Sequence, residues 1–523
     1  MPPASLSAAA FWTPACLAQT LQGDWLTEPQ SPHKVLRGVS IDTRTLQPGQ
    51  AFFAIPGSNF DGHNFLQAAA DRGAALAIVE KKPPAAPPTL PLLRVPSTIA
   101  ALQTLAQAWR DVLAASGCRV IAVAGSNGKT TARNLIHTAL SARLRGTQSP
   151  KSFNNHLGVP LTLLAAPAKD DFVVVEIGSN HPGEIAALAQ IARPDIGVIT
   201  SIGHEHLEFF GTIENVAREE ASLLAHLRPG GTAVVCDEPG QWPPTVPLDV
   251  PDGVTLLRFG TAAGCDLRIE SPVQTTPTGI TFRLTGPAHD PEAGIEGPAQ
   301  VRRSGKPPAA VEVRLPLLGA HNALNAAAAL AVARLLDVDD EAALAALARA
   351  KPMPGRMEPI ALGHGVTLIH DAYNANPSSA RAAIDQLLQM PGRRRIAILG
   401  DMFELGQLGP DAHRDLGRYL SRFAPQPDPD DPAAHAADSP ALTGQVHLAI
   451  LIGRLSMFTA ETLAKAWPPG RVQALPDWSD DLPDRVAAWT QPGDTILLKA
   501  SRGMRLERLI PAMEARWGRA GPA

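Results

Sequence analysis

The stretch "RVIAVAGSNGKTTARNLIHTAL", residues 119–140, decides the fold of this chain. Its first part, 119–124, is a short apolar run typical of a buried parallel strand. A Gly-rich turn follows, and then a segment with helical spacing, 131–144. The turn reads G-x-x-G-K-T, which is shorter than the usual G-x-x-x-x-G-K-[ST], because Val123 stands where the longer pattern needs its first Gly. Strand, Gly-rich turn and helix in this order predict a phosphate-binding loop in a parallel α/β sheet.

The loop residues have the chemistry that a nucleotide phosphate requires. We expect the backbone N–H groups of residues 125–130 and the helix N-terminus to cradle phosphate oxygens. Lys129 supplies a positive charge for the β- and γ-phosphates, and the Thr130 hydroxyl is placed to coordinate Mg²⁺. The alternative is an ordinary turn between strand and helix with a surface lysine.

The composition bounds the kind of protein. A chain of 523 residues is too long for one core, and about three domains are expected. The net charge of −4 gives no sign of a nucleic-acid binder. The first 19 residues contain no basic residue and make a poor signal peptide, and no run of about 18 apolar residues predicts a membrane span. The four cysteines lack metal or redox spacing, which fits a cytoplasmic protein: Cys16, Cys118, Cys236 and Cys265.

The pattern of strands and helices predicts an α/β protein of three domains. We expect a small N-terminal α/β domain over 1–114, a central doubly wound domain over 115–353 that carries the loop, and a C-terminal Rossmann-like domain over 354–523. In the central domain, apolar runs at 172–178, 196–203 and 232–237 alternate with helical patterns.

Three segments read differently from this alternation. Residues 254–315 have short alternating runs such as "GITFRLTG" and predict a small antiparallel sheet. Within it, 286–300 is expected to be a mobile loop. The stretch 425–440, rich in Pro, Asp and Ala, predicts a disordered surface insertion.

Polar residues follow the predicted central strands, where ligands of open α/β sheets gather. Glu176 ends one strand and is a natural Mg²⁺ ligand beside a phosphate loop. "GHEHLEFFG", 203–211, places two His and two Glu within five residues after another strand, which favours a metal role for one of them. The alternative is a polar loop whose groups bond one another.

Further candidates lie in the second half of the chain. Asn322 and Asn325 are three residues apart on one helical face and could read an adenine edge, although Asn322 could instead cap the helix. "PGRME", "HDAYNANP" and "KASRGMRLE" add charged and amide side chains after predicted strands. Alone, each of these three is also explained by turn chemistry and surface charge.

Taken together, these stretches resemble one family, the Mur ligases of peptidoglycan synthesis. The resemblance covers about residues 36–510 and rests on motifs in a fixed order: "IDTRTLQPGQAFFAIPGSNFDGH", "GSNGKTT", "FNNHLGVPLTLL", "EIGSNHPGEI", "SIGHEHLEFFG", "LGAHNALNAAAAL", "DAYNANPSS", "GDMFELG" and "KASRGMRLE". "DAYNANP", "GDMFELG" and the early "DGH" favour the branch of the family that adds a dipeptide.

The resemblance implies an ATP- and Mg²⁺-dependent ligase that joins D-Ala-D-Ala to a UDP-MurNAc-tripeptide through an acyl phosphate. It implies small-molecule substrates, a cytoplasmic place in cell-wall synthesis and a monomer, and leaves the third peptide residue open. Carried over by motif, Lys129, Glu176 and His204 are catalytic. The implied ATP contacts are Gly125, Ser126, Asn127, Gly128, Lys129, Thr130, Thr131, Asn322, Asn325, Arg356 and Asp371. The implied substrate contacts are Thr43, Arg44, Asn154, Asn155, Asn374, Asn376 and Arg502, and the implied metal ligands are Thr130, Glu176, His204 and Glu220.

Glu220 marks a departure from the family pattern. Mur ligases commonly carry a carbamylated lysine about sixteen residues after the His of the "GHEHLEFFG"-type motif, whose negative charge helps to hold Mg²⁺. Here Glu220 stands at that distance from His204, and no lysine occurs between Lys169 and Lys306. We expect the Glu220 carboxylate to supply the charge without modification, with its metal contact through water. The alternative is a solvated helix residue.

Three rivals stay open from the sequence. One is a sibling ligase that adds a single amino acid, and another is a folylpolyglutamate synthase with the same core. The third is a nucleotide-binding protein without catalysis. The nature of the amine that stimulates ADP release separates them.

Overall fold

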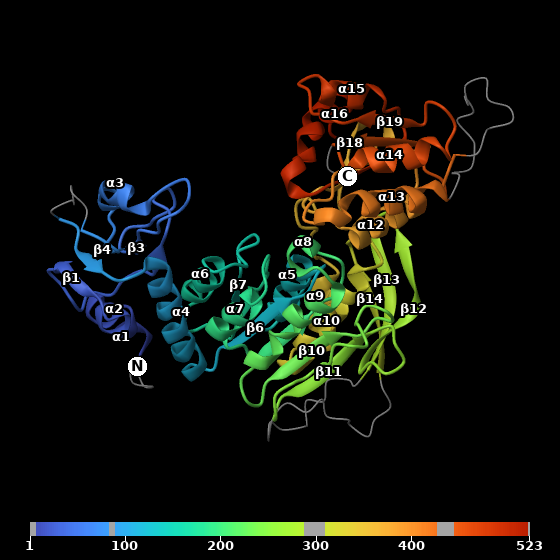
Figure 1. Ribbon diagram of the computed structural model, residues 1–523. Coiled ribbons are helices and arrows are strands. Elements are labelled where there is room, and N and C mark those ends of the chain that lie inside the picture. Colours follow the sequence, from blue (N-terminus) through green and yellow to red (C-terminus); the bar gives the residue numbers. More distant parts are fainter. Residues whose placement is uncertain (1–6, 83–88, 287–308, 426–443, 521–523) are drawn as a thin grey trace.

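The computed structural model describes residues 7–82, 89–286, 309–425 and 444–520. Most of the predicted loop at 286–300 and the predicted insertion at 425–440 lie outside the described residues. Three sheets follow one another along the chain, with five, nine and six strands (Figure 1). The prediction of an α/β protein is confirmed. No helix in the described ranges is long and apolar enough to cross a bilayer.

The first sheet lies in the N-terminal part of the chain and has the order β1-β5-β4-β3-β2. Its strands are parallel except for the β1–β5 pair. They are β1 Asp24–Thr27, β2 Val39–Ser40, β3 Ala51–Phe53, β4 Leu76–Val79 and β5 Leu92–Arg94, with helices α1 Ala8–Phe11, α2 Pro14–Leu21 and α3 Leu66–Asp71. Helix α4, Thr98–Ala115, leads from this sheet to the next one.

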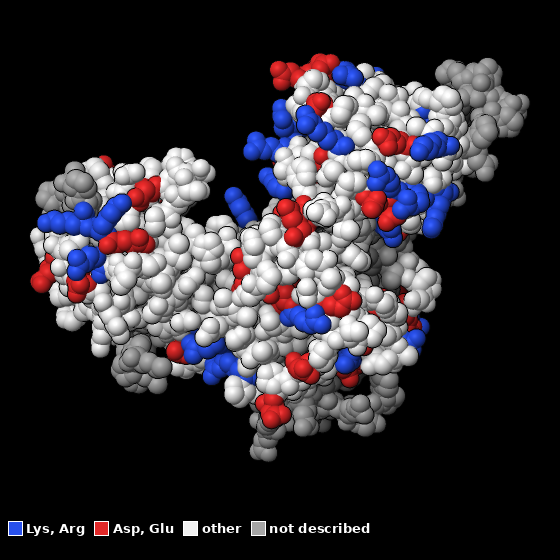
Figure 2. Space-filling model, in the orientation of Figure 1, with Lys and Arg blue, Asp and Glu red and all other residues white. Residues whose placement is uncertain are grey.

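Helix α4 packs against both neighbours. The Trp109 ring contacts Phe11 of α1 at a centroid distance of 4.9 Å, while its indole N–H donates to the carbonyl of Ala166 in the central part at 3.0 Å. Arg110, 1% exposed, ion-pairs with Asp195 at 2.7 Å. The N-terminal lobe, which holds the five-stranded sheet, is therefore fixed through α4 to the central lobe, which holds the nine-stranded sheet. Figure 2 shows a hollow between the N-terminal lobe and the C-terminal lobe, which holds the six-stranded sheet.

The central sheet carries the phosphate loop and has the order β14-β13-β12-β11-β10-β9-β6-β8-β7. The strands are β6 Arg119–Ala124, β7 Gly146–Gln148, β8 Phe172–Glu176, β9 Ile196–Ile199, β10 Thr232–Cys236, β11 Thr255–Gly260, β12 Leu267–Thr276, β13 Gly279–Gly286 and β14 Ala309–Leu315. The helices are α5 Lys129–Leu140, α6 Gly158–Ala165, α7 Glu184–Ala192, α8 Leu207–Phe210, α9 Ile213–Ala221, α10 Asn322–Leu335 and α11 Asp340–Leu347.

The prediction of a small antiparallel sheet over 254–315 is partly wrong. Strands β12, β13 and β14 are antiparallel, but β11 pairs in parallel with β10, and β12 then continues the same sheet. The alternation of apolar and polar residues predicted these strands and their half-exposed faces. It did not predict that the strands would join the edge of the central sheet, because pairing between distant segments is a long-range contact.

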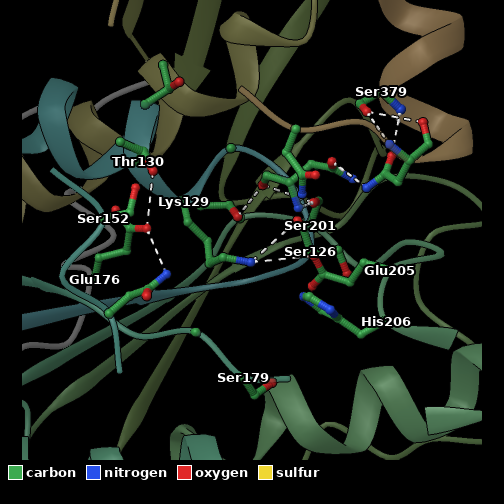
Figure 3. Close-up of a pocket in the computed structure, with 18 of the residues that line it drawn as sticks. Ser126, Lys129, Thr130, Ser152, Glu176, Ser179, Ser201, Glu205, His206 and Ser379 are labelled. Atoms are coloured by element: carbon green, nitrogen blue, oxygen red, sulfur yellow. Dashed lines mark hydrogen bonds and ion pairs between the residues drawn. The ribbon is translucent and has the colours of Figure 1, made fainter. Parts of the chain in front are cut away.

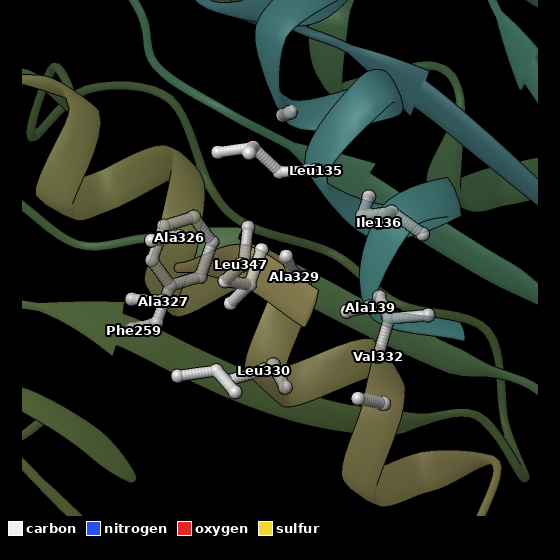
Figure 4. Close-up of a cluster of buried hydrophobic side chains, with 14 of the residues drawn as sticks. Leu135, Ile136, Ala139, Phe259, Ala326, Ala327, Ala329, Leu330, Val332 and Leu347 are labelled. Carbon is white, nitrogen blue, oxygen red and sulfur yellow. The ribbon is translucent and has the colours of Figure 1, made fainter. Parts of the chain in front are cut away.

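Helix α10 packs against α5 in the core of the central lobe (Figure 4). It is rich in alanine, and Ala326, Ala329 and Val332 pack with Leu135 and Ile136 of α5 in one buried cluster. Small side chains let the two helix backbones approach closely. The N-terminus of α10 is thereby placed against the phosphate loop.

The third sheet has the order β15-β16-β20-β17-β18-β19 and is parallel except for β15. The strands are β15 Glu358–Ala361, β16 Thr367–Asp371, β17 Arg394–Gly400, β18 Leu448–Ile452, β19 Val472–Leu475 and β20 Asp494–Lys499. Helices α12 Pro377–Gln389, α13 Gly409–Ser421, α14 Ser456–Ala464, α15 Leu482–Ala488 and α16 Ile510–Trp517 surround it. Leu207 and Phe210 of the central part pack in one cluster with Met402 and Leu405 of this lobe.

Candidate functional site

A cavity of about 1090 Å³ lies where the central and C-terminal lobes meet. It is lined by the phosphate loop, by the segments after β8, β9 and β16, and by the first turn of α10. The loop itself runs from the end of β6 to the start of α5 at Lys129. The cavity thus gathers the carboxyl ends of strands from two sheets, which is where open α/β folds bind ligands.

Two glycines in the loop are required by its geometry. Gly125 has φ +122° and Gly128 has φ +88°, a region that other residues rarely adopt. A Cβ on Gly125 would lie 2.4 Å from Thr200 Oγ1, and one on Gly128 would lie 2.4 Å from Asn325 Oδ1. The loop is therefore wedged between β9 and α10 with no room for a side chain at either position.

The first three loop N–H groups are used within the protein. Gly125 N–H donates to Glu220 Oε2 at 2.6 Å, Ser126 N–H to the carbonyl of Ser201 at 2.8 Å, and Asn127 N–H to Ser201 Oγ at 2.9 Å. The prediction that all N–H groups of 125–130 cradle phosphate is wrong for this conformation. The N–H groups at the helix start, from Gly128 onward, remain the natural phosphate donors, since the first N–H groups of a helix have no partner within it.

Lys129 is the cation at the centre of the site (Figure 3). Its Nζ donates to the Gly125 carbonyl at 2.5 Å and lies 3.5 Å from Glu205 Oε2. Burial alone would lower the pKa of Lys129, but the carboxylates of Glu205, Glu220 and Glu176 outweigh that effect and raise it. The lysine is therefore held charged at the loop.

Two buried carboxyl groups accompany this lysine. Glu205 is 8% exposed and Glu220, on α9, is 2% exposed. Burial raises the pKa of Glu205 well above its usual value, with Lys129 opposing and Glu220 adding to the shift. Burial also raises the pKa of Glu220, again with Lys129 opposing. Both carboxyl groups are close enough to Lys129 to raise its pKa, so this end of the loop is an acidic pocket around a buried lysine.

Thr130 and Glu176 form the second polar centre. The Thr130 hydroxyl donates to Glu176 Oε1 at 3.1 Å, and Asn154 Nδ2 donates to the same oxygen at 3.2 Å. Glu176 Oε2 is buried without a hydrogen-bond partner, and Arg133 Nη1 lies 3.6 Å from it. An orphaned carboxylate oxygen beside a threonine hydroxyl fits a hard cation such as Mg²⁺, which takes few protein oxygens and completes its shell with water and phosphate.

The other predicted metal ligands are not gathered around this centre by contacts in the structure. His204 lines the cavity with an exposed side chain, whereas the Glu220 carboxylate is engaged by the Gly125 N–H. Among the described residues, no group of three or more His, Cys, Asp or Glu side chains is arranged to hold a metal ion. Roles for His204 and Glu220 at a metal therefore stay predictions.

The amides predicted on the adenine side lie beneath the loop. Asn325 Nδ2 donates to Asn322 Oδ1 at 2.8 Å, and Asn322 Nδ2 donates to the Leu318 carbonyl at 2.7 Å. Both side chains are at most 5% exposed, and both residues line the cavity. The alternative of Asn322 as an N-cap is wrong, because the helix begins at Asn322 itself and the cap position is His321.

Side chains of the C-terminal lobe hydrogen-bond with the phosphate loop and with the nearby Ser152, and Asn127 Nδ2 also donates to Ser378 Oγ at 3.2 Å. Arg356 Nη2 donates to Thr130 Oγ1 at 2.8 Å, and Asn376 Nδ2 donates to Asn127 Oδ1 at 2.9 Å. Tyr373 Oη donates to Ser152 Oγ at 2.6 Å. These bonds join residues more than 200 positions apart in the chain.

Asp371 and Asn376 also make hydrogen bonds that stabilise the C-terminal lobe itself. Asp371 accepts from the Met357 N–H at 3.0 Å and from Lys499 Nζ at 2.7 Å, a buried ion pair. Asn376 caps α12 through a reciprocal pair of bonds with Ser379. Asn374 and Arg502 line the cavity with exposed side chains, and Arg502 ion-pairs with Glu507 at 3.1 Å.

The remaining predicted substrate residues divide between two places. Asn154 and Asn155 line the cavity, and Asn155 Oδ1 accepts from the Gly158 N–H at 2.9 Å at the start of α6. Thr43 and Arg44 lie in the N-terminal lobe, outside the residues that line this cavity. The Arg44 side chain is 86% exposed and ion-pairs with Asp42 at 2.6 Å.

Residues that the sequence interpretation did not assign also belong to the site. Glu205 was one of four candidates in "GHEHLEFFG", and Lys499 had no assigned role in "KASRGMRLE". Tyr373 and Arg133 carried no signal by themselves. Glu205 and Lys499 are marked as members of the site by their burial beside charges of opposite sign, which only the structure shows.

Comparisons with known proteins agree with this arrangement. Residues 35–110, 123–333 and 355–502 match, respectively, the Mur ligase catalytic domain, the Mur ligase middle domain and the Mur ligase glutamate ligase domain. The chain is 32% identical to the UDP-N-acetylmuramoyl-tripeptide–D-alanyl-D-alanine ligase of Bacillus subtilis over 94% of this chain and 96% of that protein. It is 33% identical to the Escherichia coli protein of the same name over 75% of this chain and 80% of the relative.

Solved structures give the same result. A crystal structure of MurF from Acinetobacter baumannii superposes with a TM-score of 0.78 at 29% identity and covers 96% of this chain and 99% of its own. MurF of Thermotoga maritima in complex with ADP has a TM-score of 0.71 at 25% identity and covers 92% and 97%. With three matched domains along the chain and a lengthwise relative above 30% identity, the chain belongs to the Mur ligase family.

Proposed function

We propose that this chain is the ligase that joins D-Ala-D-Ala to a UDP-MurNAc-tripeptide, with ATP converted to ADP and phosphate. The observation that carries the proposal is the cavity in which the loop with Lys129 faces Arg356, Asn374 and Asn376 of the C-terminal lobe. An ATP-driven amide synthesis needs a phosphate site and an amine site within reach of one carboxylate. The names of the relatives that match this chain along its length support the choice of substrates.

The proposed reaction has two steps. The terminal carboxylate oxygen of the tripeptide attacks the γ-phosphorus of ATP and ADP leaves, which makes an acyl phosphate. The amino group of D-Ala-D-Ala then attacks the acyl carbon, inorganic phosphate leaves with the C–O bond electrons, and the proton that the amine loses ends on the released phosphate. Both steps are governed by positioning and by charge neutralisation.

Different residues of this chain would neutralise charge and hold the metal ion. Lys129, held charged by its acidic neighbours, neutralises charge that develops between the β- and γ-phosphates. Arg356, which already reaches Thr130 Oγ1, supplies a second cation on the opposite lobe. Thr130 and Glu176 would hold Mg²⁺, which supplies electrostatic stabilisation of the transferred phosphoryl group.

The substrate contacts form a second part of the proposal. Asn154 and Asn155 would contact the sugar nucleotide, with Thr43 and Arg44 on its uridine. Asn374 and Arg502, both exposed to the cavity, are the side chains available to the dipeptide. Asn376 is engaged by Asn127 and would instead help to close the ATP site. We also propose, as the sequence predicts, that the enzyme is a cytoplasmic monomer with domains over 1–114, 115–353 and 354–523.

ADP release from the purified chain tests the proposal. With ATP, Mg²⁺ and a UDP-MurNAc-tripeptide present, ADP release should depend on D-Ala-D-Ala, and mass spectrometry should show the pentapeptide. D-Ala, D-Glu, L-Lys and diaminopimelate offered singly should give little product. Amine-independent ADP release without a peptide product would refute the proposed ligase activity, and a preference for a single amino acid would assign a sibling reaction.

A further inference from the structure

Tyr373 lies between the two lobes of the site and has no assigned role. It follows β16 and lines the cavity. The Arg356 guanidinium carbon lies over its ring, 4.3 Å from the centroid, and its hydroxyl donates to Ser152 Oγ at 2.6 Å. One side chain therefore contacts a cation of the C-terminal lobe and a hydroxyl of the central lobe.

The backbone around Arg356 is fixed to the same strand end. Tyr373 N–H donates to the Gly355 carbonyl at 3.1 Å, and Met357 N–H donates to Asp371 Oδ1 at 3.0 Å. Both neighbours of Arg356 are thus tied to the end of β16. Two contacts then orient the long Arg356 side chain: the Tyr373 ring beneath its guanidinium, and the Thr130 hydroxyl to which Nη2 donates at 2.8 Å.

Ser152 is fixed from the other direction. The segment before it is held by Arg133, which is 1% exposed and donates through Nη1 to the carbonyls of Ser149 and Lys151. Arg133 also faces Glu176 Oε2 at 3.6 Å. The partner of the Tyr373 hydroxyl therefore stands on a loop anchored to the same helix, α5, that begins at Lys129.

These contacts form a closed path around the phosphate loop. Starting at the loop threonine, the path runs through Thr130, Glu176, Arg133, the 149–151 carbonyls, Ser152, Tyr373 and Arg356, and returns to Thr130. The path crosses between the lobes twice, at the Tyr373–Ser152 bond and at the Arg356–Thr130 bond, and Tyr373 is the member at which it changes from hydrogen bonding to a cation–π contact. Removing the Tyr373 side chain takes away both the ring contact of Arg356 and the bond from the C-terminal lobe to Ser152, and leaves the Arg356–Thr130 bond.

We propose that Tyr373 is a positioning residue for nucleotide binding. Its ring directs Arg356 at the phosphate loop, and its hydroxyl couples this arrangement to the central lobe through Ser152. The ligand is a nucleoside triphosphate whose terminal phosphates meet Arg356. The inference rests on the proposed function only in taking the loop as the ATP site.

The test uses direct binding of a non-hydrolysable β,γ-methylene analogue of ATP with Mg²⁺, measured by calorimetry without peptide substrates. Tyr373→Phe and Ser152→Ala each remove one partner of the same bond and should each weaken binding by about three- to tenfold. The double variant should be no weaker than either single one. Tyr373→Leu also removes the ring and should weaken binding by a further factor of about three or more, but not in an Arg356→Ala background.

The chain offers a matched control, since it contains only two tyrosines. Tyr419, on α13, donates its hydroxyl to Asp385 within the C-terminal lobe and lies outside the cavity lining. Tyr419→Phe removes the same hydroxyl without touching the site and should leave binding unchanged. In steady-state assays, Tyr373→Phe should raise KM for ATP while kcat stays within about twofold, because a positioning contact present before and during reaction acts on binding.

Three outcomes overturn the inference. One is wild-type affinity in both Tyr373→Phe and Ser152→Ala, and another is independent, multiplying effects of these two changes. The third is equal affinity of Tyr373→Leu and Tyr373→Phe with normal melting temperatures. If Tyr373→Leu does not fold, the Phe and Ala variants decide the matter. Failure of the unaltered chain to bind the analogue would instead refute the nucleotide site of the proposed function, and this inference with it.

Discussion

The Glu220 carboxylate accepts a hydrogen bond from the Gly125 backbone N–H at 2.6 Å. This bond joins α9 to the first residue of the phosphate loop, 95 positions earlier in the chain. Glu220 is buried, and Lys129 opposes the effect of that burial on its pKa. Burial raises the pKa of Glu220 in spite of Lys129, and a negative charge from this carboxyl group in place of the family's modified lysine stays a prediction.

Glu220→Gln tests whether that charge matters for the metal. The glutamine oxygen can still accept from Gly125 N–H, so the loop geometry should persist while the charge is lost. We expect the Mg²⁺ concentration for half-maximal activity to rise by about tenfold or more, with ATP affinity reduced in parallel, because one opposite charge near a cation is worth a few kcal/mol in a buried site. Magnesium titrations of the ligase rate measure this directly.

The neighbouring residue supplies the control for that experiment. The Glu219 carboxylate accepts from the N–H groups of Gly183 and Ile185 at 2.7 and 2.9 Å, at the start of α7. Glu219→Gln makes the same chemical change on the same helix and should leave the Mg²⁺ requirement unchanged. Equal, unaltered Mg²⁺ curves for both variants would show that Glu220 has no part in the site.

An unmodified glutamate also predicts indifference to carbon dioxide. A carbamate forms reversibly from CO₂, so an enzyme that needs one loses activity when bicarbonate is removed. We expect the activity of this chain to be the same in degassed buffer and in buffer with added bicarbonate. Stimulation by bicarbonate would contradict the assignment of Glu220 and point to another modified residue.

Lys129→Ala should abolish turnover. Removal of a charged phosphate contact lowers kcat by roughly a hundred- to a thousandfold or more. The lysine also faces Glu205 at 3.5 Å, so its removal leaves buried carboxyl groups without their cation, and the melting temperature must be measured beside the rate. A folded variant with turnover within about tenfold of the original would contradict the phosphate-loop assignment.

Thr130 provides a finer test through isosteric changes. Its hydroxyl donates to Glu176 and accepts from Arg356, so Thr130→Val keeps the shape of the side chain and removes both bonds. We expect Thr130→Val to lower kcat/KM for ATP by about a hundredfold and Thr130→Ser to retain most of it. Similar rates for the Val and Ser variants would show that the hydroxyl is dispensable.

His413 predicts how the "GDMFELG" loop, 400–406, responds to acid. Its Nε2 accepts from the Met402 N–H at 3.1 Å, its Nδ1 bonds with the Gly409 carbonyl at 2.8 Å, and the residue is 1% exposed. This arrangement fits the neutral ring, and burial lowers the pKa of His413 below its usual value near 6.5. A histidine with a lowered folded pKa contributes stability above its unfolded pKa, and that stability is lost as the pH falls toward the folded pKa.

The melting temperature should therefore decline as the pH falls below about 6.5, in part through this group. His413→Gln should be less stable at pH 7, because the ring packing is lost, but its stability should depend less on pH between 7 and 5. Parallel melting curves for the two proteins across that range would show that His413 does not contribute to acid sensitivity.

Substrate binding is expected to make the molecule more compact. Figure 2 shows a hollow between the N-terminal and C-terminal lobes, and Lys and Arg side chains lie on the C-terminal lobe beside it. The segment Pro352–Gly355 joins the central and C-terminal lobes and has the Pro and Gly content that suits a hinge. Small-angle scattering should show a smaller radius of gyration with ATP analogue and tripeptide together than with either alone; unchanged profiles would contradict closure.

The local sequence predicts the secondary structure around the phosphate loop. The apolar run 119–124, the glycines of the loop and the helical spacing after Lys129 predicted the strand, turn and helix that the structure contains. Glu176 was placed correctly at a strand end facing Thr130. These features depend on residues close together in the chain, where periodicity and turn chemistry are decisive.

The tertiary structure alone decided what surrounds the loop. It brought Glu205 to Lys129, bonded Glu220 to the Gly125 N–H, used the next two loop N–H groups internally, and joined Tyr373 to Ser152 across 221 positions. It also merged the 254–315 strands into the central sheet. No local pattern encodes these contacts, because the partners of a buried charge or a strand edge are fixed only when distant segments pack together.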